Sequence, residues 1–184
     1  IIALGYKGNS IKKYFRKAKF SEKIKIKLID TGLKTMTGGR LKRLKKYLNQ
    51  TFLMTYGDGL SNVNIFKLVN FHKLKKKLLT LTAVRPPARF GAIKIVNNKV
   101  KYFKEKSSLD EGWINGGFFV LEPEIFKFIK NDKTYLERAP LEKIASMGKL
   151  IAFKHHGFWQ CMDTLRDRKI LEKKIRNKEH LEKK

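Results

Sequence analysis

The sequence predicts an α/β fold with a mixed, mostly parallel sheet flanked by helices. Short apolar runs that end at glycine or aspartate alternate with segments whose apolar residues recur at helical spacing. With 184 residues and 42% hydrophobic content, the chain is long enough for one domain with a shared core. Because strands that alternate with helices are typical of parallel sheets, we expect ligands beyond the carboxyl ends of the strands.

In the first half of the chain a strand-and-helix unit repeats. Apolar alternation predicts the strands, and leucine or isoleucine at spacings of three and four predicts the helices. The expected elements are a strand over residues 1–4, a helix over 10–15 capped by Asn9 or Ser10, a strand over 24–29, a helix with Leu41, Leu44 and Leu48 on one face, a strand over 52–56, and a helix with Ile65, Leu68, Val69 and His72 toward the core.

The second half adds an antiparallel excursion. Asn97-Asn98 separates two apolar runs, and asparagine tolerates the left-handed backbone that a tight hairpin needs. The expected elements are a strand over 78–84 ended by Pro86-Pro87, hairpin strands over 90–96 and 100–106, a strand over 118–121, helices over 124–129 and 141–146 with Gly148 closing the second, a strand over 150–153, and a helix carrying Leu165, Ile170, Leu171 and Ile175. The expected domain spans residues 1–172, and 173–184 form a basic helix end and tail.

Basic residues dominate the charge, with 43 Lys and Arg against 16 Asp and Glu and a net charge of +27. Such a charge is compatible with a nucleic-acid-binding module. However, the lysines are spread along the chain, as where Lys23, Lys25 and Lys27 alternate with apolar residues, which favours a general lysine bias over a dedicated binding stripe. A basic field would still steer anionic substrates. No apolar run is long enough to cross a membrane, and the single cysteine, Cys161, suits a reducing compartment, so we expect a cytoplasmic protein.

Two carboxylates stand out as candidate metal ligands. Asp58 lies between two glycines directly after an apolar run, and Asp163 follows the aromatic segment 157–160 just before a predicted helix. Two carboxylates suit Mg²⁺ when the ion also carries substrate phosphates. The alternatives are that Asp58 belongs to a simple turn and that Asp163 caps the helix.

Three further segments have weaker signals. Residues 35–40, Thr-Met-Thr-Gly-Gly-Arg, resemble an anion cradle at a helix start. Lys106, after Glu105, could meet a phosphate, and Asn115 a hydroxyl; an exposed ion pair and a turn are the alternatives. His155-His156 has no zinc-site partners nearby in the sequence and is interpreted as a loop.

Taken together, the ordered motifs resemble the sugar-phosphate nucleotidyltransferase family. The runs Met36-Thr37-Gly38-Gly39-Arg40 and Phe158-Trp159-Gln160 with Met162-Asp163-Thr164 resemble its cytidylyl branch, which joins glucose 1-phosphate to CTP. The matching runs lie at residues 5–8, 30–32, 36–43, 55–59, 89–92, 105–106, 114–120 and 157–167.

The resemblance implies a Rossmann-like nucleotide-diphospho-sugar transferase fold and an in-line transfer that releases pyrophosphate and leaves CDP-glucose, a precursor for O-antigen-type polysaccharides. It implies Mg²⁺ as cofactor, CTP and glucose 1-phosphate as substrates, and a homo-oligomer without membrane or specific nucleic-acid partners. The implied roles are Asp58 and Asp163 for Mg²⁺, Lys106 for the sugar phosphate, Thr35 and Arg40 for the nucleotide, and Gly91, Glu105 and Asn115 for the sugar.

Three departures from the family pattern affect these expectations. The family's first strand and its loop of the Gly-Gly-x-Gly-Thr-Arg-Leu type, which holds the triphosphate, have no counterpart from Ile1 onward, so we expect the sequence as given to be N-terminally truncated and inactive by itself. The segment between Phe15 and Thr31 is short, and Ser107 and Cys161 stand where proline is usual. The alternatives are a uridylyl, thymidylyl or guanylyl transferase, or an inactive remnant.

Overall fold

The structure, a computed structural model, describes residues 1–18, 24–86, 92–104 and 112–177. The chain divides into two compact units. The first comprises Ile1–Phe52 and Leu121–Leu150, and the second comprises Leu53–Val120 and Ile151–Lys184. The expectation of one domain over residues 1–172 stays a prediction, and each unit is described by itself.

The first unit opens with the predicted strand and helix. Strand β1 (Ile2–Leu4) pairs in parallel with β2 (Leu28–Asp30), so only the end of the expected strand over 24–29 forms. Helix α1 (Gly8–Lys17) begins after Lys7, whose φ of 55° turns the chain into the helix, and no side chain caps it. The predicted cap at Asn9 or Ser10 is therefore wrong.

The rest of the first unit is helical. Helix α2 (Thr37–Arg43) continues into the short 3₁₀ helix η1 (Lys45–Tyr47), and a second 3₁₀ helix, η2 (Pro123–Phe128), replaces the expected helix over 124–129. Helix α4 (Ala139–Ser146) ends near Gly148, whose φ of 64° confirms its closing role. Buried side chains of this unit include Leu4, Leu41, Leu44, Ile125, Ile129, Leu136 and Ile144. Their burial provides the hydrophobic core.

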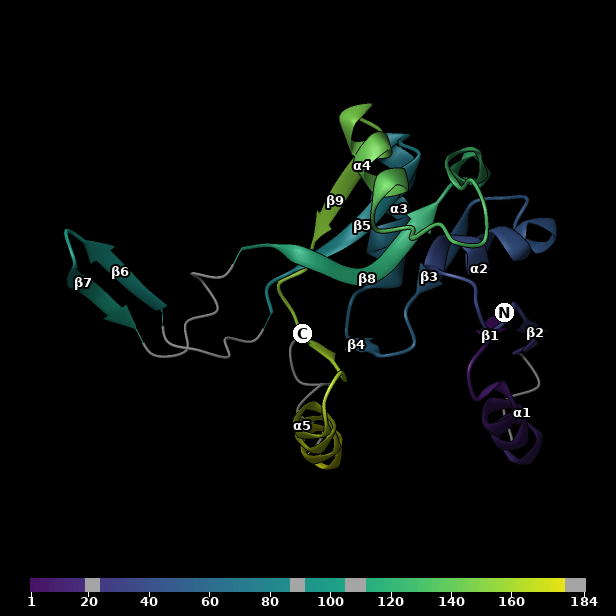
Figure 1. The fold of residues 1–184 in the computed structure, drawn as a ribbon, viewed down its shortest axis with the longest axis horizontal. Helices are drawn as coiled ribbons and strands as arrows, with labels where there is room; N and C mark the ends of the chain where they lie inside the picture. Colours follow the sequence, from purple (N-terminus) through teal and green to yellow (C-terminus); the bar gives the residue numbers. More distant parts are fainter. Residues whose placement is uncertain (19–23, 87–91, 105–111, 178–184) are drawn as a thin grey trace. The chain divides into compact units, whose positions relative to one another are not determined.

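The second unit contains a four-stranded sheet with the strand order β3-β8-β5-β9 (Figure 1). Its strands are β3 (Phe52–Thr55), β8 (Ile114–Leu121), β5 (Leu79–Val84) and β9 (Leu150–Lys154). The sheet is mixed. Strand β5 is nearly continuously buried, as expected for an interior strand. Helix α3 (Ile65–Lys75), capped by Asn64, buries Leu68 and His72, and the His72 ring nitrogen Nδ1 lies 2.8 Å from the Thr80 hydroxyl.

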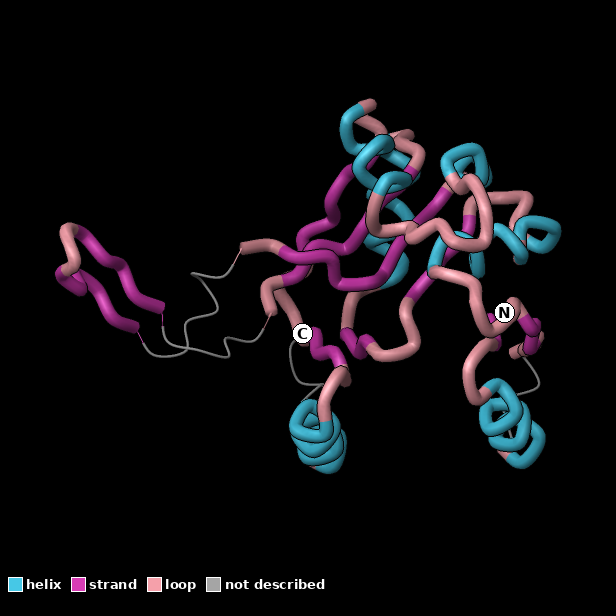
Figure 2. The backbone as a smooth tube through the Cα atoms, in the orientation of Figure 1, coloured by secondary structure: helices cyan, strands magenta, loops and turns pink. Residues whose placement is uncertain are grey.

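Two antiparallel strand pairs complete the second unit (Figure 2). The predicted hairpin is confirmed: β6 (Ala92–Val96) pairs with β7 (Lys99–Lys104), and Asn97 and Asn98 have φ of 47° and 61°. The second pair was not predicted. It joins β4 (Gly59–Ser61) to β10 (Trp159–Cys161), and helix α5 (Leu165–Arg176) follows β10 in the chain.

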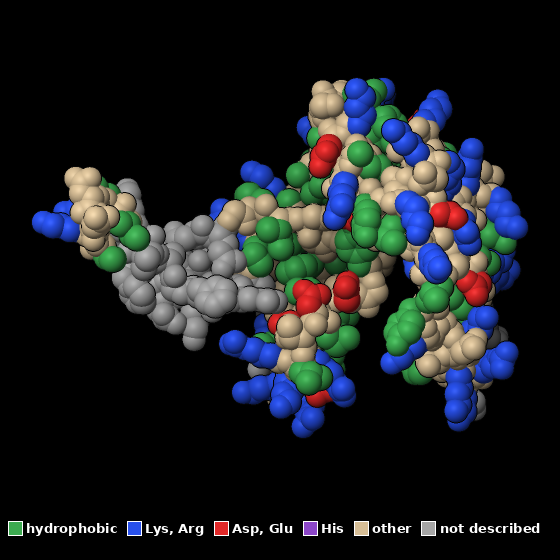
Figure 3. Space-filling view, viewed as in Figure 1, with side chains coloured by type: hydrophobic (Ala, Val, Ile, Leu, Met, Phe, Trp, Pro, Cys, Tyr) green, Lys and Arg blue, Asp and Glu red, His purple; other side chains and the backbone are tan. Residues whose placement is uncertain are grey.

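Lysine and arginine side chains are spread over the face of the molecule seen in Figure 3, with few acidic side chains between them. This distribution agrees with a general lysine bias rather than one basic stripe. Within the described ranges, no helix combines the length and the apolar character that a membrane crossing requires.

Candidate active site

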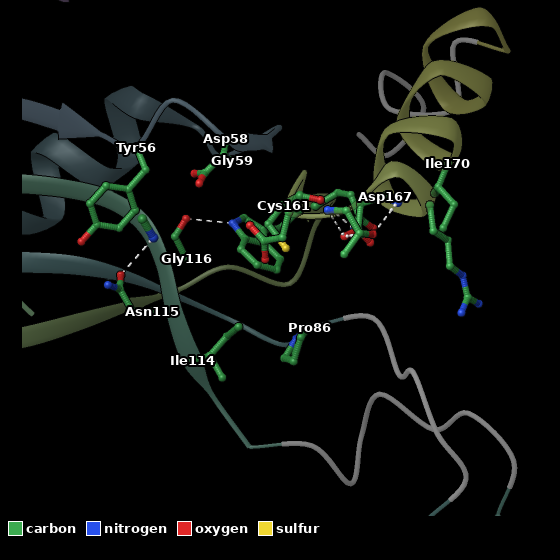
Figure 4. A pocket seen from close by; sticks show the side chains of 16 residues that line it. Tyr56, Asp58, Gly59, Pro86, Ile114, Asn115, Gly116, Cys161, Asp167 and Ile170 are labelled. Atoms are coloured by element: carbon green, nitrogen blue, oxygen red, sulfur yellow. Dashed lines mark hydrogen bonds between the residues drawn. The ribbon is translucent and has the colours of Figure 1, made fainter. Parts of the chain in front are cut away.

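A pocket of about 1010 Å³ lies in the second unit and contains both predicted metal ligands (Figure 4). All of its lining residues belong to that unit. Among them are Asp58, Asn115, Gly116, Trp159, Cys161 and Asp163. The pocket therefore gathers candidate residues that are far apart in the sequence.

The β4–β10 pair brings the two carboxylates to one place. Asp58 directly precedes β4 and Asp163 follows β10, and in the ladder Gly59 lies opposite Cys161. One step further along, the Met162 amide donates to the Asp58 carbonyl oxygen at 2.9 Å. Both aspartates are exposed, and neither carboxylate forms a hydrogen bond with a residue that the structure describes. Both carboxylates are thus available to a ligand.

Asp163 does not cap helix α5. The cap is Thr164, whose hydroxyl oxygen accepts the Asp167 amide at 3.2 Å, while the Asp167 carboxylate accepts the Thr164 amide at 3.1 Å and its hydroxyl at 2.8 Å. This reciprocal pair is a capping box. The alternative reading of Asp163 as a helix cap is wrong, and its carboxylate has no capping duty.

Asn115 lies at the start of a kinked stretch of β8. Its side-chain oxygen accepts the Gly117 amide at 2.9 Å, so its amide nitrogen is left to serve as the donor of the side chain (Figure 4). Gly117 has a φ of 76°, and its carbonyl oxygen accepts the Tyr56 amide at 3.2 Å. The kink holds Asn115 at the pocket wall, where a donor could meet a substrate hydroxyl.

Thr35 and Arg40, the predicted nucleotide ligands, belong to the first unit, where both form local hydrogen bonds. The Thr35 hydroxyl lies 2.9 Å from the carbonyl oxygens of Thr31 and Gly32. The Arg40 guanidinium donates to the Leu4 carbonyl and the Thr31 hydroxyl at 2.9 Å, and to the Thr35 carbonyl at 3.3 Å. In this structure Arg40 therefore ties the end of β1 to the loop that follows β2.

The glycines of the predicted anion cradle permit close backbone packing. A Cβ atom at Gly39 would overlap the Asp132 carbonyl, and one at Gly38 would lie 2.8 Å from the Thr134 carbonyl oxygen. The Gly39 amide itself donates to Thr134 at 3.1 Å. Part of the expected cradle is thus used to hold α2 against residues 132–134. The predicted sugar and phosphate ligands Gly91, Glu105 and Lys106 lie outside the described residues.

Comparison with known proteins identifies the family. The nucleotidyl transferase family model matches residues 1–160. A glucose-1-phosphate cytidylyltransferase from Salmonella typhi is 45% identical over 94% of this chain and 76% of its own length. The chain belongs to the nucleotidyl transferase family, among the glucose-1-phosphate cytidylyltransferases. A probable glucose-1-phosphate cytidylyltransferase from Bacillus subtilis is 38% identical over 91% of this chain and 74% of its own length.

Solved structures support the same fold. HddC from Yersinia pseudotuberculosis superposes with a TM-score of 0.68 at 23% identity, covering 94% of this chain and 76% of its own. A UDP-glucose pyrophosphorylase complexed with UDP-glucose gives a TM-score of 0.68 at 14% identity, covering 96% of this chain and 80% of its own. At these identities the likeness establishes the α/β nucleotidyltransferase fold alone.

Sequence reasoning about this nucleotidyltransferase assigned no role to several pocket residues, among them Trp159 and Arg166. Both lie in the motif around Asp163. The β4–β10 pairing places Trp159 opposite Ser61, and Trp159 and Arg166 line the same pocket as Asp58. The loop interpretation of the histidines fits the structure. His155 lies 3.1 Å from the Phe158 carbonyl oxygen, and His156 makes an edge contact with Trp113. No group of three or more His, Cys, Asp or Glu side chains that could hold a metal occurs within the described part of the chain.

Proposed function

We propose that this chain transfers a cytidylyl group from CTP to glucose 1-phosphate, which yields CDP-glucose and pyrophosphate. The observation that carries the proposal is the placement of Asp58 and Asp163 on one pocket, with both carboxylates exposed. The relative with 45% identity is a glucose-1-phosphate cytidylyltransferase, which favours CTP over the other nucleotides.

The two carboxylates suit Mg²⁺. Asp58 and Asp163 offer hard oxygen donors, whereas Asp167, the third acid on the pocket, already accepts the Thr164 amide and hydroxyl. Mg²⁺ is typically held by one or two carboxylates, and its remaining positions are filled by substrate phosphates and water. When bound, the ion would neutralise negative charge on the phosphate oxygens.

The reaction asks the protein for positioning rather than covalent chemistry. A phosphate oxygen of glucose 1-phosphate attacks the α-phosphorus of CTP, and the bond from that phosphorus to the pyrophosphate oxygen breaks. The attacking oxygen already carries negative charge, so no side chain has to remove a proton. Holding the two reactants in line and stabilising the charge on the transferring group supply most of the rate.

The remaining roles extend this scheme to the residues that the family resemblance assigns. Asn115 would donate its side-chain amide to a sugar hydroxyl, a role supported by its place on the pocket wall. Lys106 would bind the sugar phosphate, with Glu105 and Gly91 beside the sugar. Thr35 and Arg40 would contact the nucleotide. Because both side chains already form local hydrogen bonds, this contact would use the donors and acceptors that those bonds leave unused.

We also propose a cytoplasmic location, a homo-oligomeric state and no specific nucleic-acid partner. The spread of Lys and Arg in Figure 3 favours the last point, because a dedicated binder usually concentrates them on one stripe.

The test is Asp163→Asn, assayed as Mg²⁺-dependent release of pyrophosphate from CTP and glucose 1-phosphate. The expected loss is at least about 100-fold, comparable to removing an electrostatic catalytic group. Turnover is measured on the chain alone and on the chain with the glycine-rich opening of the family fused to its N-terminus. Glu142→Gln, an exposed charge in α4 of the first unit, is the control and should keep full activity.

Two results would contradict the proposal. An active Asp163→Asn protein with an unchanged Mg²⁺ requirement would remove Asp163 from the metal site. Faster pyrophosphate release from UTP, dTTP or GTP than from CTP would assign the chain to another branch of the family.

A further inference from the structure

We infer that Trp159 is a positioning residue for this reaction, because its indole N–H fixes the two carboxylates relative to Asn115. The bond from Trp159 Nε1 to the Gly116 carbonyl oxygen is 2.8 Å long and appears as a dashed line in Figure 4. We use the name carboxylate ribbon for residues 58–61 together with 159–163. The inference rests on the proposed function, which places the metal on this ribbon.

The carboxylate ribbon needs an anchor because it is short. Its strands β4 and β10 have three residues each, and an isolated two-stranded pair is at best marginally stable. Asp58 and Asp163 lie at one end of the ladder, where Met162 donates to the Asp58 carbonyl. Trp159 lies opposite Ser61 at the other end. The hydrogen bond from the indole to β8 therefore attaches the carboxylate ribbon to the four-stranded sheet. It does so at the end of the ribbon that is remote from the carboxylates.

The acceptor of this bond is a rigid point of the sheet. A Cβ atom at Gly116 would lie 2.7 Å from a Val84 methyl carbon and 3.0 Å from the Thr82 carbonyl oxygen, so β8 and β5 are in close contact there. Gly116 is also the immediate neighbour of Asn115 in the chain. Trp159 thus connects the ribbon to Gly116, the residue beside Asn115, whose side chain is proposed to donate a hydrogen bond to the sugar.

This connection bears directly on the chemistry. The proposed reaction joins the α-phosphorus of CTP, whose phosphates would be held at the carboxylates, to a phosphate oxygen of glucose 1-phosphate, whose sugar would be held at Asn115. Small errors in the spacing of two such reactants slow a reaction strongly. Replacing Trp159 by Phe keeps an aromatic ring but removes the N–H, which leaves the Gly116 carbonyl without this partner. The carboxylates would keep their chemistry and lose their fixed placement.

The experiment measures Mn²⁺ binding to the full chain by electron paramagnetic resonance of the free ion. A chain of net charge +27 binds cations poorly at random, so the titration reports specific sites. We expect Asp163→Asn to abolish binding and Trp159→Phe to weaken it about tenfold, as is typical of the loss in metal affinity when a residue that orients the ligands is replaced.

Two controls separate positioning from general stability. Trp113→Phe is the same substitution at the other of the chain's 2 tryptophans, whose ring contacts Arg85 and Lys154. Thr80→Val removes a buried hydrogen bond, to His72, elsewhere in the same unit. Both should bind Mn²⁺ within about twofold of the unchanged chain, because each removes packing contacts or a hydrogen bond without touching the ribbon.

The outcomes test the metal site and the role of Trp159 separately. Unchanged binding in Asp163→Asn would refute the proposed metal site. Loss in Asp163→Asn with unchanged binding in Trp159→Phe, or an equal loss in Thr80→Val, would overturn the role of Trp159 alone. If Trp159→Phe does not fold, the unaltered chain still decides: on titration with Mg²⁺ the Trp159 indole N–H signal should shift in the NMR spectrum while that of Trp113 stays, and an unmoved Trp159 signal would overturn the inference.

Discussion

Gly117→Ala should destabilise the second unit strongly, because the site is built around a glycine conformation. Gly117 has a φ of 76°, which costs an L-residue about 1–2 kcal/mol. A Cβ atom there would also lie 2.7 Å from Cδ2 of Tyr56. That ring is held edge-on against Phe119 with centroids 5.6 Å apart, so it cannot simply move away. Overpacking of this kind adds about 1–3 kcal/mol, and the expected total is about 2–5 kcal/mol.

Two other glycines separate these contributions. Gly148 has a φ of 64° with no atom near its virtual Cβ, so Gly148→Ala should cost about 1 kcal/mol from the backbone alone. Gly57 has neither a positive φ nor a neighbour within 4 Å, so Gly57→Ala should leave stability within about 0.5 kcal/mol. The three variants therefore form a series from no perturbation to strain combined with crowding.

The assay is urea unfolding followed by circular dichroism, with all variants fitted to a common slope. Gly117→Ala should have the lowest midpoint and Gly57→Ala the highest. A Gly117→Ala protein as stable as Gly57→Ala would show that the kink in β8 is not enforced. The kink also binds Asn115 through the Gly117 amide, so the same variant should raise the KM for glucose 1-phosphate wherever turnover is measurable.

Two further predictions concern charge and access. Asp132→Asn should lower the free energy of unfolding at neutral pH and low salt, because the Arg43 hydrogen bond holds the pKa of the Asp132 carboxyl below its ordinary value of 3.8. The stabilisation by the Asp132 carboxylate is fully present above pH 3.8 and is lost as the pH falls through the lower pKa of the folded state. The difference in unfolding free energy between the variant and the unchanged chain should therefore vanish below that pKa. It should also shrink as salt is added. Cys161, the single cysteine, lines the pocket and should react more slowly with a thiol reagent when Mg²⁺ and CTP are present; an unchanged rate at saturation would contradict the site.

The sequence was sufficient for most elements whose pattern is local. The hairpin at Asn97-Asn98 and the closure of α4 at Gly148 were predicted from residues that tolerate a left-handed backbone, and both have it in the structure. The strand expected over 24–29 was overextended, because alternating lysine and isoleucine satisfy the strand pattern without any guarantee of a pairing partner. Only residues 28–30 pair with β1.

Three of the predicted site residues, Asp58, Asn115 and Asp163, line one pocket, but the sequence did not predict how they come together. Asp58 and Asp163 were recognised from their local surroundings and from the family resemblance, and the structure places both on one pocket. The pairing of β4 with β10 was missed, since strands of three residues fall below the length at which alternation gives a signal. Without that pairing, Trp159 is one aromatic residue among several and has no evident role.

Asp163 shows how two interpretations of one residue can be separated. An aspartate before a helix is a good cap, so its type and position alone favour neither capping nor metal binding. The deciding residues lie further along: Thr164 and Asp167 have the spacing of a capping box, and the structure shows their bonds at 3.1 and 3.2 Å. A helix has one cap. Because Thr164 occupies that position, Asp163 has no bond within the described part of the chain that explains an acid at this place. Since the chain has only 16 acidic residues, ligand binding becomes the better account of its presence.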